Sequence, residues 1–460
     1  MHDVLAILGD RVSNARQPGF RITRADDAPA IAAYQALRTT VFVDEQGLFT
    51  GHDLDEHDAD PRTVVLVARD RDGTVIGGVR LGPADDGPDL GWWLGGRLVV
   101  AKASRGRVGP ALIRAACAYA ENAGVLRFEA TVQVTNVALF TELGWDSVRP
   151  VTVADTAHEL MRWPIGRIAT LAKATKSDLG SLLTGLTGVP GFVGDDGVPV
   201  PGSDLVAACD AIVPSMVERD PEWAGWCSVL VNVNDLAAMG ADPVGLLDAV
   251  GARDRSFATR VFAGLRRASE AYGVPVLGGH TQLGVPAALS VTALGRTAEP
   301  IPGGGGRPGH QVRLTADLGG QWRQGYAGRQ WDSTTSRRRP ELRAMLGAVA
   351  QGRPAAAKDV SMAGIAGTLG MLAEASGCGA ELELARIPRP GEASMGDWLT
   401  CFPGFAMLTT GEPGGAPLPA GPATSVDCGR LVGGQGVVLC WPDGERTEVL
   451  GGGVTGLGTA

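Results

Sequence analysis

The 460-residue sequence lacks the features that mark several classes of protein. It has 41 Lys and Arg against 50 Asp and Glu, and so no basic surplus of the kind that binds nucleic acid or anionic lipid. Its seven cysteines are odd in number and no two have C-x-x-C spacing, which argues against a disulfide framework or a zinc ribbon. No apolar run approaches the roughly 20 residues that span a bilayer, and we expect no signal peptide. These absences favour a cytoplasmic protein with no membrane or nucleic-acid partner.

Glycine and proline, by contrast, are abundant. The 67 Gly and 29 Pro make up about a fifth of the chain, too much for an all-helical bundle or a coiled coil. No G-X-Y period and no long biased tract occurs, which excludes collagen and extensive disorder. The length allows about two to four domains. We therefore expect a multidomain protein of the α/β and α+β classes.

The N-terminal part alternates between strand-like and helix-like patterns. Val64–Ala68 and Val75–Leu81 flank an Asp-Gly turn and predict a β-hairpin. Gly95–Val100 predicts a strand, and Pro110–Ala123 predicts a helix that ends at Gly124. The turn between this strand and this helix contains small residues. Its backbone N–H groups and the helix N-terminus could bind a pyrophosphate, or the turn could be a plain connection.

The order of these elements resembles the GNAT acetyltransferase family over residues 20–163. The segment from Leu37 to Gln46 is similar to the opening of one GNAT subgroup, and the segment from Asn136 to Trp145 resembles the family's core. The resemblance implies a mixed sheet with helices, and a coenzyme A pyrophosphate held by the strand–turn–helix. The residues it implies for binding acyl-CoA are Val100, Arg105, Gly106, Arg107, Val108, Gly109 and Asn136.

Two features depart from the GNAT pattern. In the turn, Ser104 and Arg107 replace the usual Arg or Gln and a close-approach glycine, although Gly106 could compensate. Phe140 stands where the family often has a tyrosine, and a phenyl ring has no proton to give to a leaving thiolate. Acyl transfer would therefore need water or another side chain as the acid, or it would be weak or absent.

An acidic segment lies within this part of the chain. From Asp44 to Asp60 there are seven carboxylates and no Lys or Arg. One interpretation is a solvated loop. The other is an acidic mouth for an amine substrate, with Glu45 or His57 as the base that deprotonates the amine.

From Ile168 onward, aspartates recur at the ends of predicted elements. They lie in a Gly-flanked loop, at the end of an apolar run, on the predicted helix Pro221–Met239 and before another helix: Asp195, Asp196, Asp210, Asp235 and Asp359. Carboxylates that converge from several elements can hold Mg²⁺ against nucleotide phosphates. Any one of them alone could equally be a turn or cap residue.

Three segments in this part resemble the AIR synthase-related (PurM-like) superfamily. Val231–Pro243 is very similar to a helix of its thiamine monophosphate kinase branch. Tyr272–Thr281 resembles the GGDT element, with His280 in place of the aspartate, as in many selenophosphate synthetases. Lys358–Ser361 resembles the KDVT element of the same enzymes.

This resemblance covers about residues 166–460. It implies two α/β halves, residues 166–298 and 308–460, and the Gly-rich stretch at 302–309 is the best linker candidate in the chain. It also implies a homodimer through the N-terminal halves, and Mg-ATP bound by the five aspartates, Lys358, Gly278 and Gly279. His280 could be a ligand or an acid–base group, or it could simply be hydrogen-bonded to a loop carbonyl.

Departures from this family narrow the chemistry. Met362 stands where kinase members carry a second aspartate, and no cysteine lies between Cys117 and Cys209, where selenophosphate synthetases carry the reactive residue. Our leading hypothesis is a bifunctional enzyme in which one unit transfers an acyl group from acyl-CoA to an amine and the other uses Mg-ATP to activate a substrate oxygen by phosphorylation. The alternatives are a ligand-binding or scaffolding protein with one or both sites degenerate, and a kinase of the thiamine monophosphate type.

Overall fold

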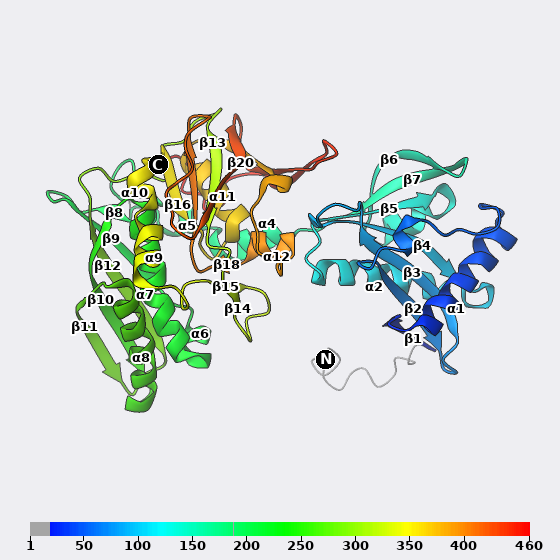
Figure 1. Cartoon of the computed structure of the whole chain (residues 1–460), viewed down its shortest axis with the longest axis horizontal. Helices are drawn as coiled ribbons and strands as arrows, with labels where there is room; N and C mark the ends of the chain where they lie inside the picture. The colour runs from blue at the N-terminus through cyan, green and yellow to red at the C-terminus, as the bar shows by residue number, and fades with distance from the viewer. Residues whose placement is uncertain (1–18, 187) are drawn as a thin grey trace. The chain divides into compact units, whose positions relative to one another are not determined.

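The computed structural model describes residues 19–186 and 188–460. The chain divides into two compact units, and the boundary lies between Ile165 and Gly166. Each unit mixes helices and strands, as expected for the α/β and α+β classes (Figure 1). None of the helices in the described part of the chain is long and apolar enough to cross a membrane.

The N-terminal unit is built on a seven-stranded mixed sheet in its described residues, with strand order β1-β2-β3-β4-β5-β7-β6. Its central pair, β4 and β5, is parallel and the other pairs are antiparallel. The predicted hairpin is present as β2 and β3. The strands are β1 Phe20–Arg24, β2 Val64–Asp70, β3 Val75–Pro83, β4 Trp92–Val100, β5 Arg127–Gln133, β6 Asp146–Val153 and β7 Thr156–Trp163.

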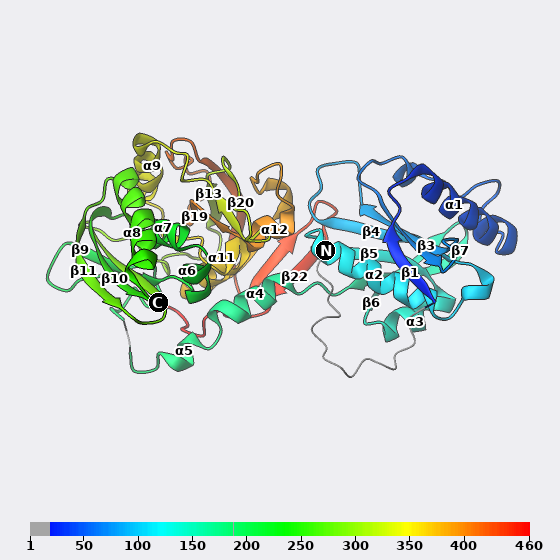
Figure 2. The same ribbon diagram turned by 90° about the horizontal axis from the view of Figure 1, so that it is seen from below.

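Helices cover both faces of this sheet. Helix α1 (Ala28–Arg38) runs into a π-helical segment at Thr39–Glu45, and α2 (Val108–Asn122) and the short α3 (Val137–Glu142) follow. Along β2, alternate residues join two different apolar clusters, one packed under α1 and one under α2. Because successive side chains of a strand point to opposite faces, α1 and α2 lie on opposite sides of the sheet (Figure 2).

The first half of the C-terminal unit contains a five-stranded sheet with the order β11-β10-β12-β9-β8. Helices α7 and α8 lie side by side on one face of it (Figures 1 and 2). Helix α7 is buried on almost every side because the sheet and α8 both pack against it. The elements are β8 Val198–Pro199, β9 Leu205–Ala211, α6 Pro214–Arg219, α7 Pro221–Ala238, β10 Asp242–Ala252, α8 Arg255–Tyr272, β11 Val276–Leu283 and β12 Ala288–Arg296.

The second half contains a seven-stranded sheet with the order β16-β19-β13-β20-β17-β21-β22, and a small sheet with the order β14-β15-β18. One apolar cluster joins α7 to residues of this half, so the two halves share a core. The strands are β13 Gln311–Ala316, β14 Gln321–Trp322, β15 Gln330–Asp332, β16 Ala356–Asp359, β17 Gly379–Glu383, β18 Phe402–Pro403, β19 Ala406–Gly411, β20 Thr424–Val432, β21 Val437–Cys440 and β22 Arg446–Leu450. The helices outside the first half are α4 Arg167–Lys176, α5 Leu179–Leu182, α9 Arg339–Leu346, α10 Ala348–Gly352, α11 Gly364–Ala375 and α12 Met395–Thr400.

The Gly-rich stretch at 302–309 is packed rather than free to move as a linker would be. The N–H of Gly303 donates to Asp195 Oδ2 at 2.8 Å. A Cβ atom added to Gly305 would lie 1.9 Å from the carbonyl oxygen of Ala355. Glycine is needed here because other backbone segments approach too closely for a side chain.

Candidate functional site

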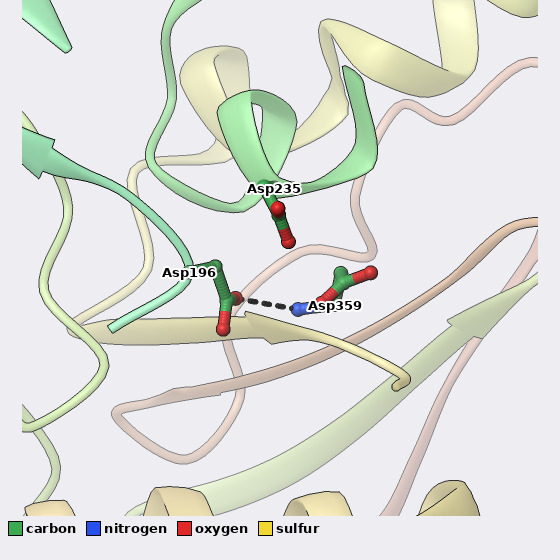
Figure 3. A group of neighbouring side chains, drawn as sticks. All are labelled: Asp196, Asp235 and Asp359. Carbon is green, nitrogen blue, oxygen red and sulfur yellow. Dashed lines mark hydrogen bonds between the residues drawn. The ribbon is translucent and has the colours of Figure 1, made fainter. Parts of the chain in front are cut away.

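Three aspartates from separate elements meet in the C-terminal unit (Figure 3). Asp196 lies in the loop before β8, Asp235 lies on α7, and Asp359 ends β16. One carboxylate oxygen from each lies within 4.8 Å of the other two. The backbone N–H of Asp359 also donates to Asp196 Oδ2 at 2.8 Å, which fixes these two residues relative to each other. Oxygen ligands at this spacing can share one divalent cation.

The electrostatics of these three aspartates, which we call the carboxylate cluster, favour a cation. Burial raises the pKa of Asp235 well above its usual range, and the carboxylates of Asp359, Asp210 and Asp196 raise it further. Burial also raises the pKa of Asp359, together with the charges of Asp196 and Asp210. Like charges at this distance disfavour one another unless a cation or protons are present. The donor set therefore fits a hard divalent ion such as Mg²⁺.

Lys358 and Asp195 support the cluster from one side. The Lys358 ammonium is buried and donates to Asp196 Oδ1 at 3.0 Å and to the carbonyl of Gly194 at 2.8 Å. Burial alone would lower the pKa of Lys358, but the charges of Asp196 and Asp195 outweigh it and raise that pKa. Burial raises the pKa of Asp195 to about 6, although Lys358 opposes this. Asp195 lies against Gly303 and 3.8 Å from the Lys358 ammonium, outside the group of three.

Asp210 and His280 lie at different distances from the cluster. Asp210 lies on β9 and is exposed at the surface; surrounding protein atoms reduce its hydration and raise its pKa, and the charge of Asp196 adds to the effect, so Asp210 is an electrostatic neighbour of the cluster. His280 lies on β11, opposite Ala249 of β10. Strands β10 and β12 both lie between β11 and β9. Three strand spacings amount to about 14 Å. Within one chain, His280 is therefore about three strands away from Asp210 on β9, and the same exposed edge strand carries Gly278 and Gly279.

Two residues near the cluster were not predicted as site residues. The hydroxyl of Ser361, two residues after Asp359, is buried without a hydrogen-bond partner. The charge of Lys176, at the end of α4, reaches both Asp210 and Asp359 and opposes the rise in their pKa values. The similarity of Lys358–Ser361 to the KDVT element could have drawn attention to Ser361, but Lys176 carried no local signal.

The N-terminal unit contains two adjoining cavities where β4 and β5 separate. These parallel strands pair only from Trp92 to Gly95 of β4, and Arg97 then adopts a left-handed backbone with φ of 52°. One cavity has a volume of about 140 Å³ and is lined mainly by apolar side chains. The other has a volume of about 170 Å³, and its polar lining residues include Asp55, His57 and Arg80. Gly95, Gly96, Arg97 and Thr131 line both.

The predicted acidic segment is largely an ion-pair network. Arg38 is fully buried; its Nε donates to Asp53 Oδ2 at 2.7 Å, and its Nη1 donates to Asp58 Oδ1 at 2.6 Å. Burial alone would raise the pKa of Asp58, but the Arg38 hydrogen bond and the charge of Arg80 hold it far below its usual range. Both carboxylates are paired with the same buried arginine.

Two further guanidinium groups complete the network. Arg80 Nη2 and Arg97 Nη2 donate to Asp55 Oδ2 at 2.8 and 2.9 Å. Three arginines thus neutralise Asp53, Asp55 and Asp58, so neither of our two interpretations describes these residues. The arginines that pair with the acidic segment come from α1, β3 and β4, so the segment itself needs no basic residue.

The predicted acyl-CoA residues lie around the start of α2. Gly106 has φ of 101°, a value that favours glycine, and α2 begins at Val108, beside Arg107 and Gly109 and near Val100 at the end of β4. The Arg105 guanidinium pairs with Glu45. Asn136 lines the apolar cavity.

Two other residues of the apolar cavity bear on the missing tyrosine. Phe140 is one of its walls and packs on Trp145, with ring centroids 5.3 Å apart. His158 also lines the cavity, with Nδ1 2.9 Å from the carbonyl of Thr156. His158 could not be predicted as a site residue from the sequence, because β7 has no motif around it.

Comparisons with known proteins agree with the division of the chain into two units. Residues 194–297 match the AIR synthase related protein N-terminal domain, and residues 303–445 match the corresponding C-terminal domain. An uncharacterized protein of Synechocystis is 37% identical over 229 residues, which are 48% of this chain and 70% of that protein. The chain belongs to the AIR synthase related family. It also carries an acetyltransferase (GNAT) family domain, matched over residues 30–145.

Two further matches are to a kinase and to a solved structure. A thiamine-monophosphate kinase of Methanospirillum hungatei is 31% identical over 219 residues, 43% of this chain and 75% of the kinase. The structure titled T. maritima PurL complexed with ATP has a TM-score of 0.51 and 17% identity, and the match covers 65% of this chain and 53% of that one. The second likeness shows a shared PurM-like fold.

Proposed function

We propose that the C-terminal unit uses Mg-ATP to phosphorylate an oxygen of a small molecule, and that the GNAT domain transfers an acyl group from acyl-CoA to an amine. The observation that carries the first part is the carboxylate cluster of Asp196, Asp235 and Asp359. The kinase relative and the ATP complex of PurL support the choice of nucleotide.

The residues that would hold Mg²⁺ are those of the carboxylate cluster, with Asp210 as a neighbouring charge. When bound, Mg²⁺ offsets charge on the phosphate oxygens. Lys358 orients Asp196 through its hydrogen bond and reduces the net charge of the site. Asp195 stabilises the turn at Gly303, which lies against the same lysine.

The relatives favour a second candidate, direct phosphorylation of a phosphorylated alcohol as in a thiamine-type kinase. Met362 weighs against it, since 51% of this residue is exposed and a thioether does not bind Mg²⁺. The two candidates differ in their product. A kinase of this type yields a stable diphosphate and ADP, whereas oxygen activation for displacement by nitrogen releases inorganic phosphate.

A turnover screen tests this part of the proposal. The purified chain is incubated with ATP, Mg²⁺ and pools of amides, alcohols and phosphorylated metabolites, and products are identified by mass spectrometry. We expect ADP formation that depends on a substrate, abolished by Asp359→Asn and retained by the matched control Asp204→Asn on the exposed side of the same unit. Equal turnover by both variants would exclude the carboxylate cluster from the reaction.

The paired cavities support acyl transfer by the GNAT domain. An apolar cavity beside a polar one suits an acyl thioester that meets a polar acceptor at Gly95 and Gly96. His57, in the polar cavity, and Glu45, beside Arg105, are the proposed bases that take the amine proton.

We also propose a homodimer through the first half of the C-terminal unit. The five-stranded sheet has α7 and α8 on one face, and large apolar side chains of β10 and β11 are exposed, including Leu247 at 41% and Leu277 at 55%. A second copy would cover this surface. Leu277→Lys should convert a dimer to a monomer in light scattering, and a wild-type monomer would refute the proposal.

The seven cysteines are all free thiols in the described structure, which supports the proposed cytoplasmic location.

A further inference from the structure

The apolar cavity of the GNAT domain is larger than an acetyl group requires. Its lining residues extend from the π-helical segment after α1 to β7, and large apolar side chains form most of its walls. They include Phe42, Leu98, Ile113, Phe128 and Trp145. Its volume of about 140 Å³ is close to that of an engineered apolar cavity of about 150 Å³ that stays dry and binds benzene.

The inner end of this cavity lies within the protein core. Ile113, Phe128 and Trp145 belong to the buried apolar cluster beneath α2. Two small residues of the same cluster, Ala116 on α2 and Ala130 on β5, also line the cavity. Their short side chains leave space that larger residues would fill. Apolar space of this kind favours an alkyl chain over water.

Several of the polar lining residues are exposed or half-buried, whereas His158 is buried. Thr131 and Asn136 are exposed and Gln133 is half-buried, where its amide pairs with Gln46. The polar rim and the apolar interior together match a molecule with a polar thioester end and an apolar tail.

We infer that the acyl donor of the GNAT domain carries a medium-length alkyl chain, and that this cavity holds the chain. The inference rests on the proposed acyl transfer and names its substrate class. In the transfer, the amine nitrogen bonds to the thioester carbonyl carbon and the C–S bond breaks. A base takes the amine proton, and water supplies the proton that the departing thiolate gains.

Binding of a series of thioesters tests the inference. Coenzyme A and its acetyl, butyryl, hexanoyl and octanoyl thioesters are titrated into the full chain by calorimetry. Each added methylene that enters the cavity should tighten binding about fourfold. We expect affinity to rise from acetyl-CoA to octanoyl-CoA.

A matched pair of variants locates the chain. Ala116→Leu fills the inner end of the cavity and should flatten the dependence on chain length while the affinity for coenzyme A stays unchanged. Ala118→Leu, on the exposed side of the same helix, should behave as the wild type. Thermal unfolding checks that each variant folds. If Ala116→Leu does not fold, Leu98→Trp fills the cavity from β4, where Leu98 is only partly buried.

The outcomes separate this inference from the proposal beneath it. Tight binding of coenzyme A with equal affinity for acetyl and octanoyl thioesters would overturn the medium-chain inference and leave acyl transfer standing. Chain-length dependence that survives both cavity-filling variants would place the chain elsewhere and also overturn it. No binding of any coenzyme A species would refute the proposed acyl transfer itself, and the inference with it.

Discussion

Arg38 is the residue whose replacement should most destabilise the N-terminal unit. The side chain is 0% exposed and donates four hydrogen bonds: to Asp53 Oδ2, to the Asp53 carbonyl and to both carboxylate oxygens of Asp58. Arg38→Met keeps much of the volume but leaves Asp53, only 2% exposed, without this buried cation. Removing one partner of a buried ion pair costs about 3–5 kcal/mol. For a unit of this size that corresponds to a fall in Tm of roughly 6–20 °C.

Differential scanning calorimetry of the full chain measures this effect. The control is Arg24→Met, because Arg24 and Asp26 form an exposed pair, and such pairs contribute at most about 1 kcal/mol. Adding Asp58→Asn to Arg38→Met should recover part of the loss, since it removes one of the unpaired charges. A Tm change for Arg38→Met no larger than that of Arg24→Met would refute the view that this network supports the wall of the polar cavity.

Two further predictions concern the C-terminal unit. The pKa of Asp195, Asp235 and Asp359 is raised on folding, so the stability these groups contribute is present below their ordinary pKa and is lost as pH rises through the raised values. Without Mg²⁺, Tm should therefore fall as pH rises through about 6, the raised pKa of Asp195, less steeply in Asp235→Asn, and a Tm that rises over this range would contradict the assignment. Gly305→Ala should lower the free energy of unfolding by about 1–3 kcal/mol because its Cβ meets the Ala355 carbonyl. Gly433→Ala has open space and should be neutral in urea unfolding; equal effects would argue against the packed role of Gly305.

Much of the fold could be predicted because its signals are local. The β2–β3 hairpin is encoded by a turn between two apolar runs, and α7 by a continuous apolar stretch with a family motif. The ion-pair network could not be predicted from the acidic segment, since its cations lie 15 to 44 positions away. A signal was present all the same. Ala30, Tyr34 and Arg38 recur every four residues on α1, and all three are buried.

The site was harder to predict than the fold because it depends on how segments meet. Five aspartates looked equivalent in the sequence, and only the packing of α7 against β16 and the loop before β8 separates the three that converge. The glycines at 302–309 suggested a flexible linker. Glycine also occurs where two segments of the chain approach closely, and the contacts of this stretch with Asp195 and Ala355 show that it has this second role. The position of His280 follows from strand order, which no local pattern encodes.

Calorimetric titration of ATP into the full chain, with Mg²⁺ and with EDTA, tests the central claim most directly. We expect ATP to bind with Mg²⁺ and to lose at least about tenfold in affinity, about 1.4 kcal/mol, in EDTA or in Asp235→Asn. Asp204→Asn should bind as the wild type does, and the melting curve of Asp235→Asn should show a folded protein. ATP binding that is indifferent both to Mg²⁺ and to Asp235→Asn would contradict the assignment of the carboxylate cluster as the Mg-ATP site.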